Sequence, residues 1–273
     1  MDNIITIYLF IIICILICFS NRLQRGQPVN IEYLKPKESH IIHVFWTGGF
    51  DSTFRICQLL IDEKRKVQPI YVNVSSIDGF FILGNKVKRE SIHYELKTMN
   101  KIRQYLNKKY PYTKKLLLKT IKVNSIQKDQ EYLNAMKNLY FQKYGICAPF
   151  LNQFNGYFSR PYNQYTTIAQ YSKNYKYPIE VSVEKCDTGM DKHTQKYRTG
   201  KGHQCQLIQN KPGSLQIFDK LRFPIIHLTK QDMYKIAKQN KYDDVLKQTW
   251  SCWFPKNGKP CGRCDMCKHR VSF

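Results

Sequence analysis

Four cysteines near the C-terminal end are spaced as ligands of a single metal ion. They fall within 16 residues: Cys252, Cys261, Cys264 and Cys267. Thiolates at this spacing can close around one tetrahedral Zn²⁺ ion at about 2.3 Å per sulfur. Gly258 and Gly262 allow the tight turns that this closure requires. The pattern predicts a zinc site, and an iron–sulfur cluster or unligated thiols are the alternatives.

A second chemically suggestive segment contains two adjacent glycines after Thr47. Adjacent glycines let the backbone turn sharply and let a ligand approach closely. The hydroxyl and N–H groups of Thr47, Ser52 and Thr53 are expected at a helix N-terminus, which favours anions. Asp51 can hold Mg²⁺ against the same phosphates. The segment matches neither GxxxxGK[ST] nor GxGxxG. It predicts a phosphate site, with an ordinary strand–turn–helix as the alternative.

Strands and helices that alternate along the chain must position these groups. Residues 41–46 are apolar and β-rich and end at the glycines, and residues 53–65 carry apolar side chains on one helical face. This alternation predicts an α/β fold, with a parallel sheet and helices on both faces. Residues 187–215 are expected to form an active-site loop or an insertion. The other predicted strands are 67–74, 116–123 and 179–183, and the other predicted helices are 90–110, 129–144 and 149–175.

Composition and charge narrow the functional classes. The chain has 273 residues, of which 42% are hydrophobic, so collagen-like, low-complexity and acidic-tail classes are excluded. The 44 Lys and Arg against 20 Asp and Glu give a net charge of +24, which attracts polyanions. Residues 80–122 contain 12 basic and two acidic residues, a local charge of +10. A solvated helix face is the first interpretation of this stretch, and a surface facing RNA, DNA or a membrane is the alternative.

Residues 4–19 form an apolar run of 16 residues near the N-terminus. As a helix the run would extend about 24 Å. Arg22 and Arg25 follow it, which predicts a single-pass membrane anchor with the body facing the cytosol. A signal peptide and a buried extension are the alternatives. Reduced cytosolic thiols favour metal ligands over disulfides. The predicted parts are an anchor (1–20), a linker (21–40), a nucleotide-binding α/β domain (41–222) and a C-terminal helix with the zinc segment (223–273).

Residues 47–52 (TGGFDS) resemble the SGGxDS motif of the PP-loop ATP pyrophosphatases, and Thr47 keeps the hydroxyl of the usual first Ser. In this superfamily the motif binds the pyrophosphate of ATP, and the enzymes split ATP between the α and β phosphates. The resemblance implies a Rossmann-like sheet of the adenine-nucleotide hydrolase kind, with ATP and Mg²⁺ bound. It implies catalytic roles for Asp51 and Ser52. The nucleotide-binding residues that it implies are Phe45, Trp46, Thr47, Gly48, Gly49, Phe50, Asp51, Ser52 and Thr53.

The C-terminal residues resemble the signature of the 7-cyano-7-deazaguanine synthases, the QueC family. Residues 249–253 (TWSCW) and 260–270 (PCGRCDMCKHR) are similar to TWSCY and CGxCxxCxxR. Residues 223–230 (FPIIHLTK) are similar to the segment before the last helix of the family, where Thr229 and Asp232 can form a capping box. The resemblance implies one structural zinc and an ATP-dependent carbon–nitrogen ligase. That family joins ammonia to 7-carboxy-7-deazaguanine through an acyl adenylate, and then uses ATP again to form the nitrile.

The middle of the chain departs from the family pattern. Residues 76–79 (SIDG) stand where the family usually has a DYGQRH-like string, and residues 186–189 only approach its GYPDCR segment. The substrate is therefore open between a deazapurine and another small carboxylate. A PP-loop enzyme that modifies tRNA or DNA bases is one alternative function. A membrane-anchored nucleotide- or zinc-binding module without turnover is another. The oligomeric state is open, with a homodimer as one alternative.

Overall fold

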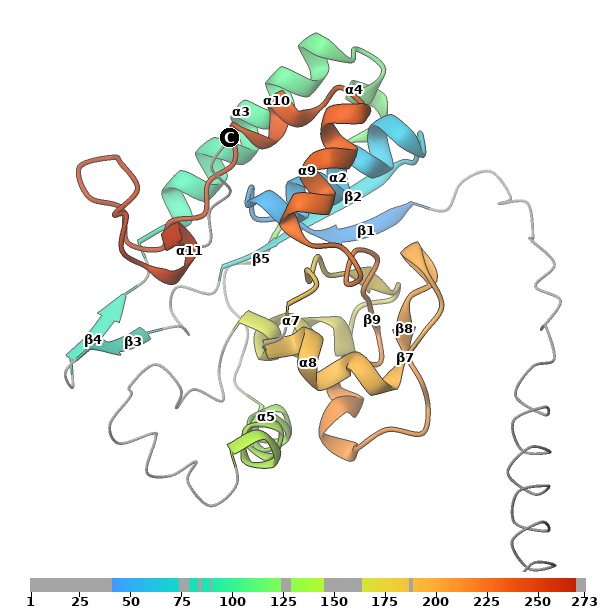
Figure 1. Cartoon of the computed structure of the whole chain (residues 1–273), viewed down its shortest axis with the longest axis vertical. Helices are drawn as coiled ribbons and strands as arrows, with labels where there is room; N and C mark the ends of the chain where they lie inside the picture. The colour runs from blue at the N-terminus through green and yellow to red at the C-terminus, as the bar shows by residue number, and fades with distance from the viewer. Residues whose placement is uncertain are drawn as a thin grey trace, which may run out of the picture. The chain divides into compact units, whose positions relative to one another are not determined.

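Five parallel strands form the central sheet in the computed structural model of the chain (Figure 1). The structure describes residues 41–73, 79–82, 85–88, 90–123, 129–144, 164–186 and 189–268. Neighbouring strands pair in parallel, as Ile42 does with Val67 and His43 with Ile179. The predicted α/β fold with a parallel sheet is thereby confirmed. In spatial order the strands are β5 (Ile121–Val123), β2 (Val67–Val72), β1 (Ile42–Phe45), β6 (Ile179–Glu180) and β9 (Leu221–Arg222).

Two hydrophobic cores lie on opposite faces of this sheet, because successive side chains of a strand point to opposite sides. Val44 belongs to one core and Phe45 to the other. Figure 1 shows the two helical layers above and below the strands, as predicted. The helices on the Val44 side are α2 (Phe50–Cys57), α3 (Ile92–Lys109), α9 (Lys230–Gln239) and α10 (Asp243–Leu246). Those on the Phe45 side are α5 (Gln130–Tyr144), α7 (Gln164–Lys173) and α8 (Gly189–Thr194).

A buried ion pair joins α2 to the sheet. Arg55 of α2 donates from Nε and Nη2 to the two carboxylate oxygens of Glu180 in β6, at 2.7 and 2.9 Å. Its Nη1 atom donates to Gln58 and Glu63, in and just after the π-helical turn η2 (Gln58–Asp62) that continues α2. Removing one partner of a buried pair costs about 3–5 kcal/mol. The ion pair therefore holds α2 against β6, and with it the glycine turn that precedes α2.

Residues 116–123 differ from the predicted strand. Only β5 at its end is a strand, and the one-turn helix α4 (Thr113–Leu116) precedes it. The reason lies in tertiary contacts: Arg103 of α3 donates to the carbonyls of Leu117 and Leu118 at 2.7 and 2.9 Å. Those carbonyls are thus occupied by a side chain of α3. An apolar run in the sequence does not reveal such a long-range donor.

Short elements lie in the region that we expect to be an active-site loop or an insertion, and in other described parts of the chain. The antiparallel pair β7 (Arg198–Thr199) and β8 (Gln206–Leu207) lies within residues 187–215. A second antiparallel pair consists of β3 (Gly79–Ile82) and β4 (Asn85–Lys88). Of the predicted helix 149–175, only the part that contains α7 is described. The remaining elements are the 3₁₀ turns Gln195–Tyr197, Gly202–Gln204 and Gly213–Phe218 and the helix α11 (Asp265–Lys268).

The structure contradicts the predicted membrane anchor. Among the residues that it describes, none of the helices combines the length and the apolar character needed to cross a bilayer. Residues 4–19, for which we predict the anchor, lie outside the described residues. Their 16 apolar residues would extend about 24 Å as a helix, less than the roughly 30 Å of a hydrocarbon core. The anchor is therefore not retained, and neither are the membrane contact and the localisation derived from it.

Candidate functional site

The glycine turn lies at the carboxyl end of β1, where the strand order of the sheet reverses. From β1 the chain first builds β2 and β5 on one side and then β6 and β9 on the other. Ligands of open α/β sheets bind outside the carboxyl ends of the strands at such a reversal. Residues 181–186, which follow β6, belong to the same edge because β6 is parallel to β1. The fold therefore brings the turn and the segment after β6 together.

The turn itself leaves the start of α2 open to a ligand. Gly48 has a φ of +74°, the left-handed region that favours glycine, and Gly49 is the N-cap residue of α2. The Thr53 N–H donates to the Gly49 carbonyl at 3.0 Å. Bonds to the Thr47 and Ser52 hydroxyls are long, at 3.4 Å each, and therefore weak. These hydroxyl and N–H groups can be redirected to an anion at the positive end of the helix.

Gly48 lies so close to its neighbours that a Cβ atom there would force them to shift. A Cβ atom on Gly48 would lie 3.1 Å from Cγ of Met99 and 3.2 Å from the carbonyl oxygen of Glu95, both on α3. From the other side, the Trp250 N–H donates to the Gly48 carbonyl at 3.0 Å. Both the conformation and the space therefore require glycine at this position.

Asp51 is part of a charged cluster that the sequence did not predict. Oδ1 of Asp51 lies 3.8 Å from Nζ of Lys230, which also forms an ion pair with Glu184. The same oxygen is buried and has no hydrogen-bond partner among the described residues, and so is Oγ of Ser182. Burial raises the pKa of Asp51 to about 7, against the opposing effect of the Lys230 ammonium group, and Glu184 raises the pKa further. An unpartnered carboxylate oxygen at this edge suits a cation such as Mg²⁺.

The other predicted nucleotide-binding residues contribute differently. Trp46 and Thr53 are fully buried, and the Trp46 indole N–H donates to Thr53 Oγ1 at 3.1 Å. Phe45 and Phe50 are also buried, in the two cores of the sheet. These four buried side chains pack beneath the turn and support it. Only the backbone groups of these residues can reach a ligand. Among the other turn residues, Thr47 and Gly49 are partly exposed, whereas Gly48 and Ser52 are buried.

Lys230 and Glu184 are the residues that sequence reasoning missed. Lys230 ends the FPIIHLTK segment and is the first residue of α9, after the N-cap Thr229. The predicted capping box is confirmed: Thr229 Oγ1 accepts from the Asp232 N–H at 3.1 Å, and Asp232 accepts from the Thr229 N–H at 3.0 Å. The box fixes the start of the helix and thereby the position of Lys230. Glu184 had no comparable signal, because only the sheet brings it near the turn.

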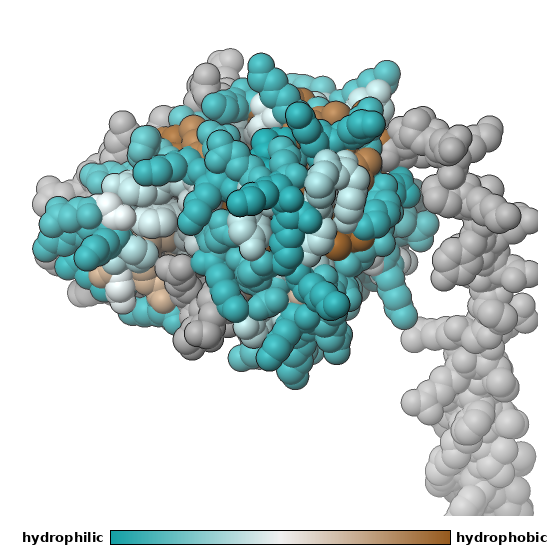
Figure 2. Space-filling view, turned by 90° about the horizontal axis from the view of Figure 1, so that it is seen from above, coloured by the Kyte–Doolittle hydropathy of each residue, from teal (hydrophilic) through white to brown (hydrophobic). Residues whose placement is uncertain are grey.

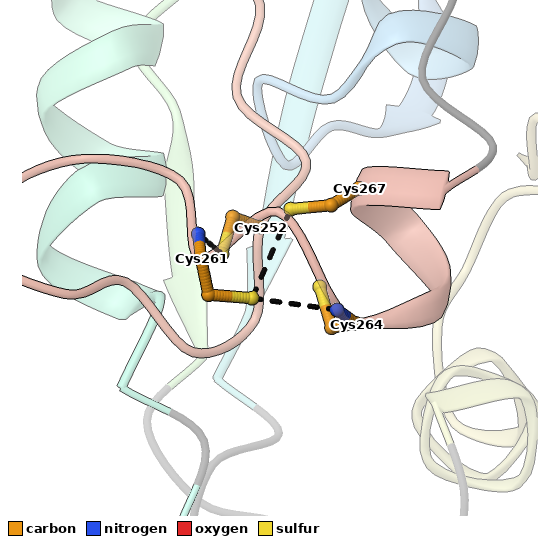
Figure 3. A group of neighbouring side chains, drawn as sticks. All are labelled: Cys252, Cys261, Cys264 and Cys267. Atoms are coloured by element: carbon orange, nitrogen blue, oxygen red, sulfur yellow. Dashed lines mark hydrogen bonds between the residues drawn. The ribbon is translucent and has the colours of Figure 1, made fainter.

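The four predicted metal-ligating cysteines converge, as Figure 3 shows. All four Sγ atoms lie within 4.8 Å of one another, and those of Cys261 and Cys267 are 3.9 Å apart. A tetrahedral zinc site with 2.3 Å bonds requires sulfur atoms about 3.8 Å apart. Backbone N–H groups of Cys261 and Cys264 donate to the sulfurs of Cys252 and Cys261 at 3.2 and 3.4 Å. The donor set and its spacing fit a closed, structural zinc site.

Local turns and backbone dipoles shape this cluster. Asn257 and Gly258 have positive φ values of 49° and 75° in the turn closed by Lys256 and Lys259, and Gly262 has a φ of 70°. Although burial disfavours the thiolate of Cys261, backbone N–H groups of Arg263 and Cys264 lower its pKa to about 6. A lowered pKa favours the thiolate form that binds metal. Burial acts in the opposite direction at two other cysteines of the cluster: it raises the pKa of Cys252 to about 12 and also raises that of Cys267.

Some basic side chains of residues 80–122 make contacts within the folded chain. Arg103 binds the carbonyls before β5, and Lys109 forms an ion pair with Asp244 at 2.6 Å. Other lysines of α3 and α4 are exposed: Lys97, Lys101, Lys108, Lys114 and Lys115. Figure 2 shows that the face seen from above is mostly hydrophilic. Contact with RNA or DNA stays a prediction, and so does a homodimer.

Comparison with known proteins finds a family model that matches the C-terminal part of the chain. The model of the family "Queuosine biosynthesis protein QueC" matches residues 212–272. This range contains Lys230, Trp250 and the four clustered cysteines. The chain is similar to the QueC family of PP-loop proteins. The glycine turn lies outside the matched range, so the QueC match and the turn are separate indications.

Curated relatives are similar to this chain over a segment about as long as the family match. The 7-cyano-7-deazaguanine synthase of Prochlorococcus marinus strain AS9601 is 40% identical over 63 residues, which are 23% of this chain and 27% of that protein. The protein of the same name from Leptospira interrogans serovar Lai (strain 56601) is 40% identical over 60 residues, 22% of this chain and 24% of that protein. The chain thus spans about a quarter of the length of the curated relatives that it matches.

Proposed function

We propose that this chain is an ATP-dependent carbon–nitrogen ligase that adenylates a substrate oxygen at the glycine turn. The observation that carries the proposal is the Asp51 carboxylate, whose buried oxygen has no hydrogen-bond partner among the described residues and lies beside Lys230 at the positive end of α2. Such a site offers one cation, one metal ligand and the weakly bonded N–H groups of Thr47 and Gly49 to a polyphosphate. The QueC similarity of residues 212–272 supports ATP as the polyphosphate.

In this proposal the turn binds the phosphates and Asp51 carries the metal. The N–H and hydroxyl groups of Thr47, Gly48, Gly49 and Ser52 donate to the β and γ phosphates. Asp51 holds Mg²⁺, which neutralises phosphate charge when it is bound. Lys230 is held between Asp51 and Glu184 without nucleotide, and we expect it to turn toward the leaving pyrophosphate. Positioning and charge neutralisation then supply most of the rate enhancement.

The proposed chemistry has two ATP-consuming stages. In the first, a carboxylate oxygen of the substrate attacks the α phosphorus, the bond between the α phosphorus and the bridging oxygen breaks, and pyrophosphate leaves. Ammonia then attacks the acyl carbon, loses a proton and displaces AMP, which gives the amide. In the second stage the amide oxygen attacks the α phosphorus of a second ATP and pyrophosphate leaves; the nitrogen then loses both of its protons and the carbon–oxygen bond breaks, which releases AMP and leaves the nitrile. The name of the curated relatives supports 7-cyano-7-deazaguanine as the product, and the resemblance to that family implies 7-carboxy-7-deazaguanine as the substrate.

The four cysteines take no part in this chemistry as proposed. A closed Cys₄ site has no open coordination position, so bound zinc stabilises the segment and does not activate water. The proposed ligands are Cys252, Cys261, Cys264 and Cys267, whose sulfurs lie within 4.8 Å of one another.

Product analysis tests the proposal directly. We expect the full chain, incubated with Mg²⁺, ATP, ammonium and 7-carboxy-7-deazaguanine, to release AMP and pyrophosphate and to form the amide and the nitrile, measured by mass spectrometry. ATP turnover with another small carboxylate but not with the deazapurine would retain the ligase and reject the substrate. Absence of ATP binding and of AMP with every carboxylate would reject the proposal.

A pair of matched variants tests whether ATP turnover takes place at the glycine turn. Asp51→Asn removes the metal ligand and is expected to lower kcat by at least about a hundredfold, the usual effect of losing one electrostatic group in a site. Asp243→Asn is the control, because Asp243 pairs only with the surface residue Lys247 of the same helical stretch in the described ion pairs. Equal activity of Asp51→Asn and the control would remove Asp51 from the mechanism.

A further inference from the structure

The glycine turn and the zinc segment are in direct contact, although about two hundred residues separate them in the sequence. Trp250 stands two residues before Cys252, and its N–H donates to the Gly48 carbonyl at 3.0 Å. The Trp250 carbonyl also lies 3.7 Å from the position that a Cβ atom on Gly49 would take. Both glycines of the turn are therefore in contact with the backbone of one residue.

The side chain of Trp250 is held at both ends. Its ring stacks on Tyr94 of α3, with centroids 4.7 Å apart and planes 13° from parallel. Its indole N–H donates to the Cys252 carbonyl at 2.8 Å. One residue links α3 and a metal-ligating cysteine to the turn.

Helix α3 closes the arrangement on the opposite side of the turn. Met99 and the Glu95 carbonyl lie against Gly48, in the same helix that carries Tyr94. Just before this helix, the Glu90 N–H donates to the carbonyl of Trp253 at 3.2 Å. Residues on both sides of Cys252 thus contact α3 or the residues just before it. The turn lies between α3 and Trp250, and its shape depends on their spacing.

We propose that Trp250 is a positioning residue through which the zinc site holds the glycine turn in its nucleotide-binding shape. The nucleotide part of this inference rests on the proposed function. The segment 249–268 has one helix of four residues in the structure, so its order depends mainly on the cysteine cluster. Metal binding supplies the folding free energy of such segments. Without metal the turn samples other shapes, and apparent affinity falls in proportion to the competent fraction.

Hydrogen–deuterium exchange of the full chain tests the link without using nucleotide. The zinc-loaded chain is compared with the same chain after a chelator has removed zinc. We expect faster exchange in residues 249–268 and also in residues 47–53, whereas β2 (Val67–Val72) serves as the reference and keeps its protection. Faster exchange in 249–268 with unchanged exchange in 47–53 would overturn the inference.

ATP affinity of the two forms provides the second measurement. Calorimetric titration with Mg²⁺ and ATP is expected to show about tenfold weaker binding after zinc removal, if about a tenth of the chains keep the competent turn. Equal affinity in both forms would overturn the inference and leave the proposed function standing. No ATP binding by either form would reject the proposed function, while the exchange experiment would still decide the link between zinc and turn.

Variants of the two tryptophans beside Cys252 separate positioning from general stability. Trp250→Leu removes the stacking and the indole bond, and is expected to keep its zinc but to weaken ATP binding about tenfold and to raise KM more than it lowers kcat. Trp250→Phe keeps an aromatic ring against Tyr94 and should recover part of the affinity. Trp253→Leu is the matched control, because the hydrogen bond described for Trp253 joins its backbone carbonyl to Glu90. Equal ATP affinities of Trp250→Leu and Trp253→Leu would contradict the role of Trp250.

Discussion

The glycine turn and the cysteine cluster are built in opposite ways. The cluster gathers four ligands from 16 consecutive residues, and its turns and N–H···S bonds lie inside that stretch. The turn is short in sequence, but its shape is set by Met99 and Glu95 from α3 and by Trp250 from the C-terminal segment. The contacts that shape the cluster are therefore local, whereas the turn depends on the rest of the fold.

This difference indicates how each region should respond to change. A locally built metal site fails when a ligand is lost and is little affected by distant residues. A turn whose shape depends on long-range contacts loses that shape when any of the contacting residues moves. The contact of Trp250 with Gly48 is where the local region supports the non-local one.

Loss of a cysteine ligand should have the largest effect. We expect Cys264→Ser to weaken zinc binding by more than about a hundredfold, since even changes outside the ligand shell cost about 10–100-fold. Metal content after dialysis against a chelator measures this. Cys186→Ser is the control, because Cys186 lies outside the cluster and should leave the zinc content unchanged. Full zinc occupancy in Cys264→Ser would contradict the predicted ligand set.

A side chain at Gly48 should have the next largest effect. Gly48→Ala forces a positive φ on an L-residue and places its Cβ against Met99 and Glu95, so we expect a loss of about 1–3 kcal/mol in the free energy of unfolding. Urea denaturation measures the loss. Gly213→Ala is the control, because a Cβ there meets nothing within 4 Å. If the two variants are equally stable, the turn is less constrained than its contacts indicate.

The pH dependence of ATP binding should show the smallest effect. In the fold Asp51 has a pKa of about 7, against 3.8 for an ordinary carboxyl. Between about pH 4 and pH 7 the folded chain therefore holds a proton on Asp51 that the unfolded chain has lost. Its contribution to stability is therefore complete below about pH 4 and is lost as the pH rises to about 7. Metal binding needs the ionised form, so ATP affinity should rise about fivefold from pH 6 to pH 7 and less than twofold from pH 7 to pH 8.

The same titration of Asp51→Asn provides the comparison for this pH effect. The variant has no carboxyl at this position, so its residual ATP affinity should lack the rise between pH 6 and pH 7. An identical rise in both proteins would assign the titration to another group. Parallel measurement of zinc content would show that the cysteine cluster does not change over this range.

Patterns confined to short stretches were predicted well. The capping box at Thr229 and Asp232 forms as expected, and the four cysteines converge. Helix α5 begins and ends within a residue of its predicted range. The predicted strand 116–123 was partly wrong: Leu117 forms only an isolated bridge with Val67 before β5, and Arg103 of α3 binds the carbonyls of Leu117 and Leu118. Errors arose where a partner distant in sequence decided the local backbone.

The sequence by itself determined the alternating α/β fold and the metal-ligating spacing of the cysteines, and it predicts a phosphate site at residues 47–52. Each depends on residue types over a few neighbouring positions. Only the tertiary structure decided that Lys230 and Glu184 lie beside Asp51, and that Trp250 contacts Gly48. These groups are far apart along the chain and meet because parallel strands end at one edge of a sheet. Local periodicity does not encode such pairings, so they appear only once the sheet is formed.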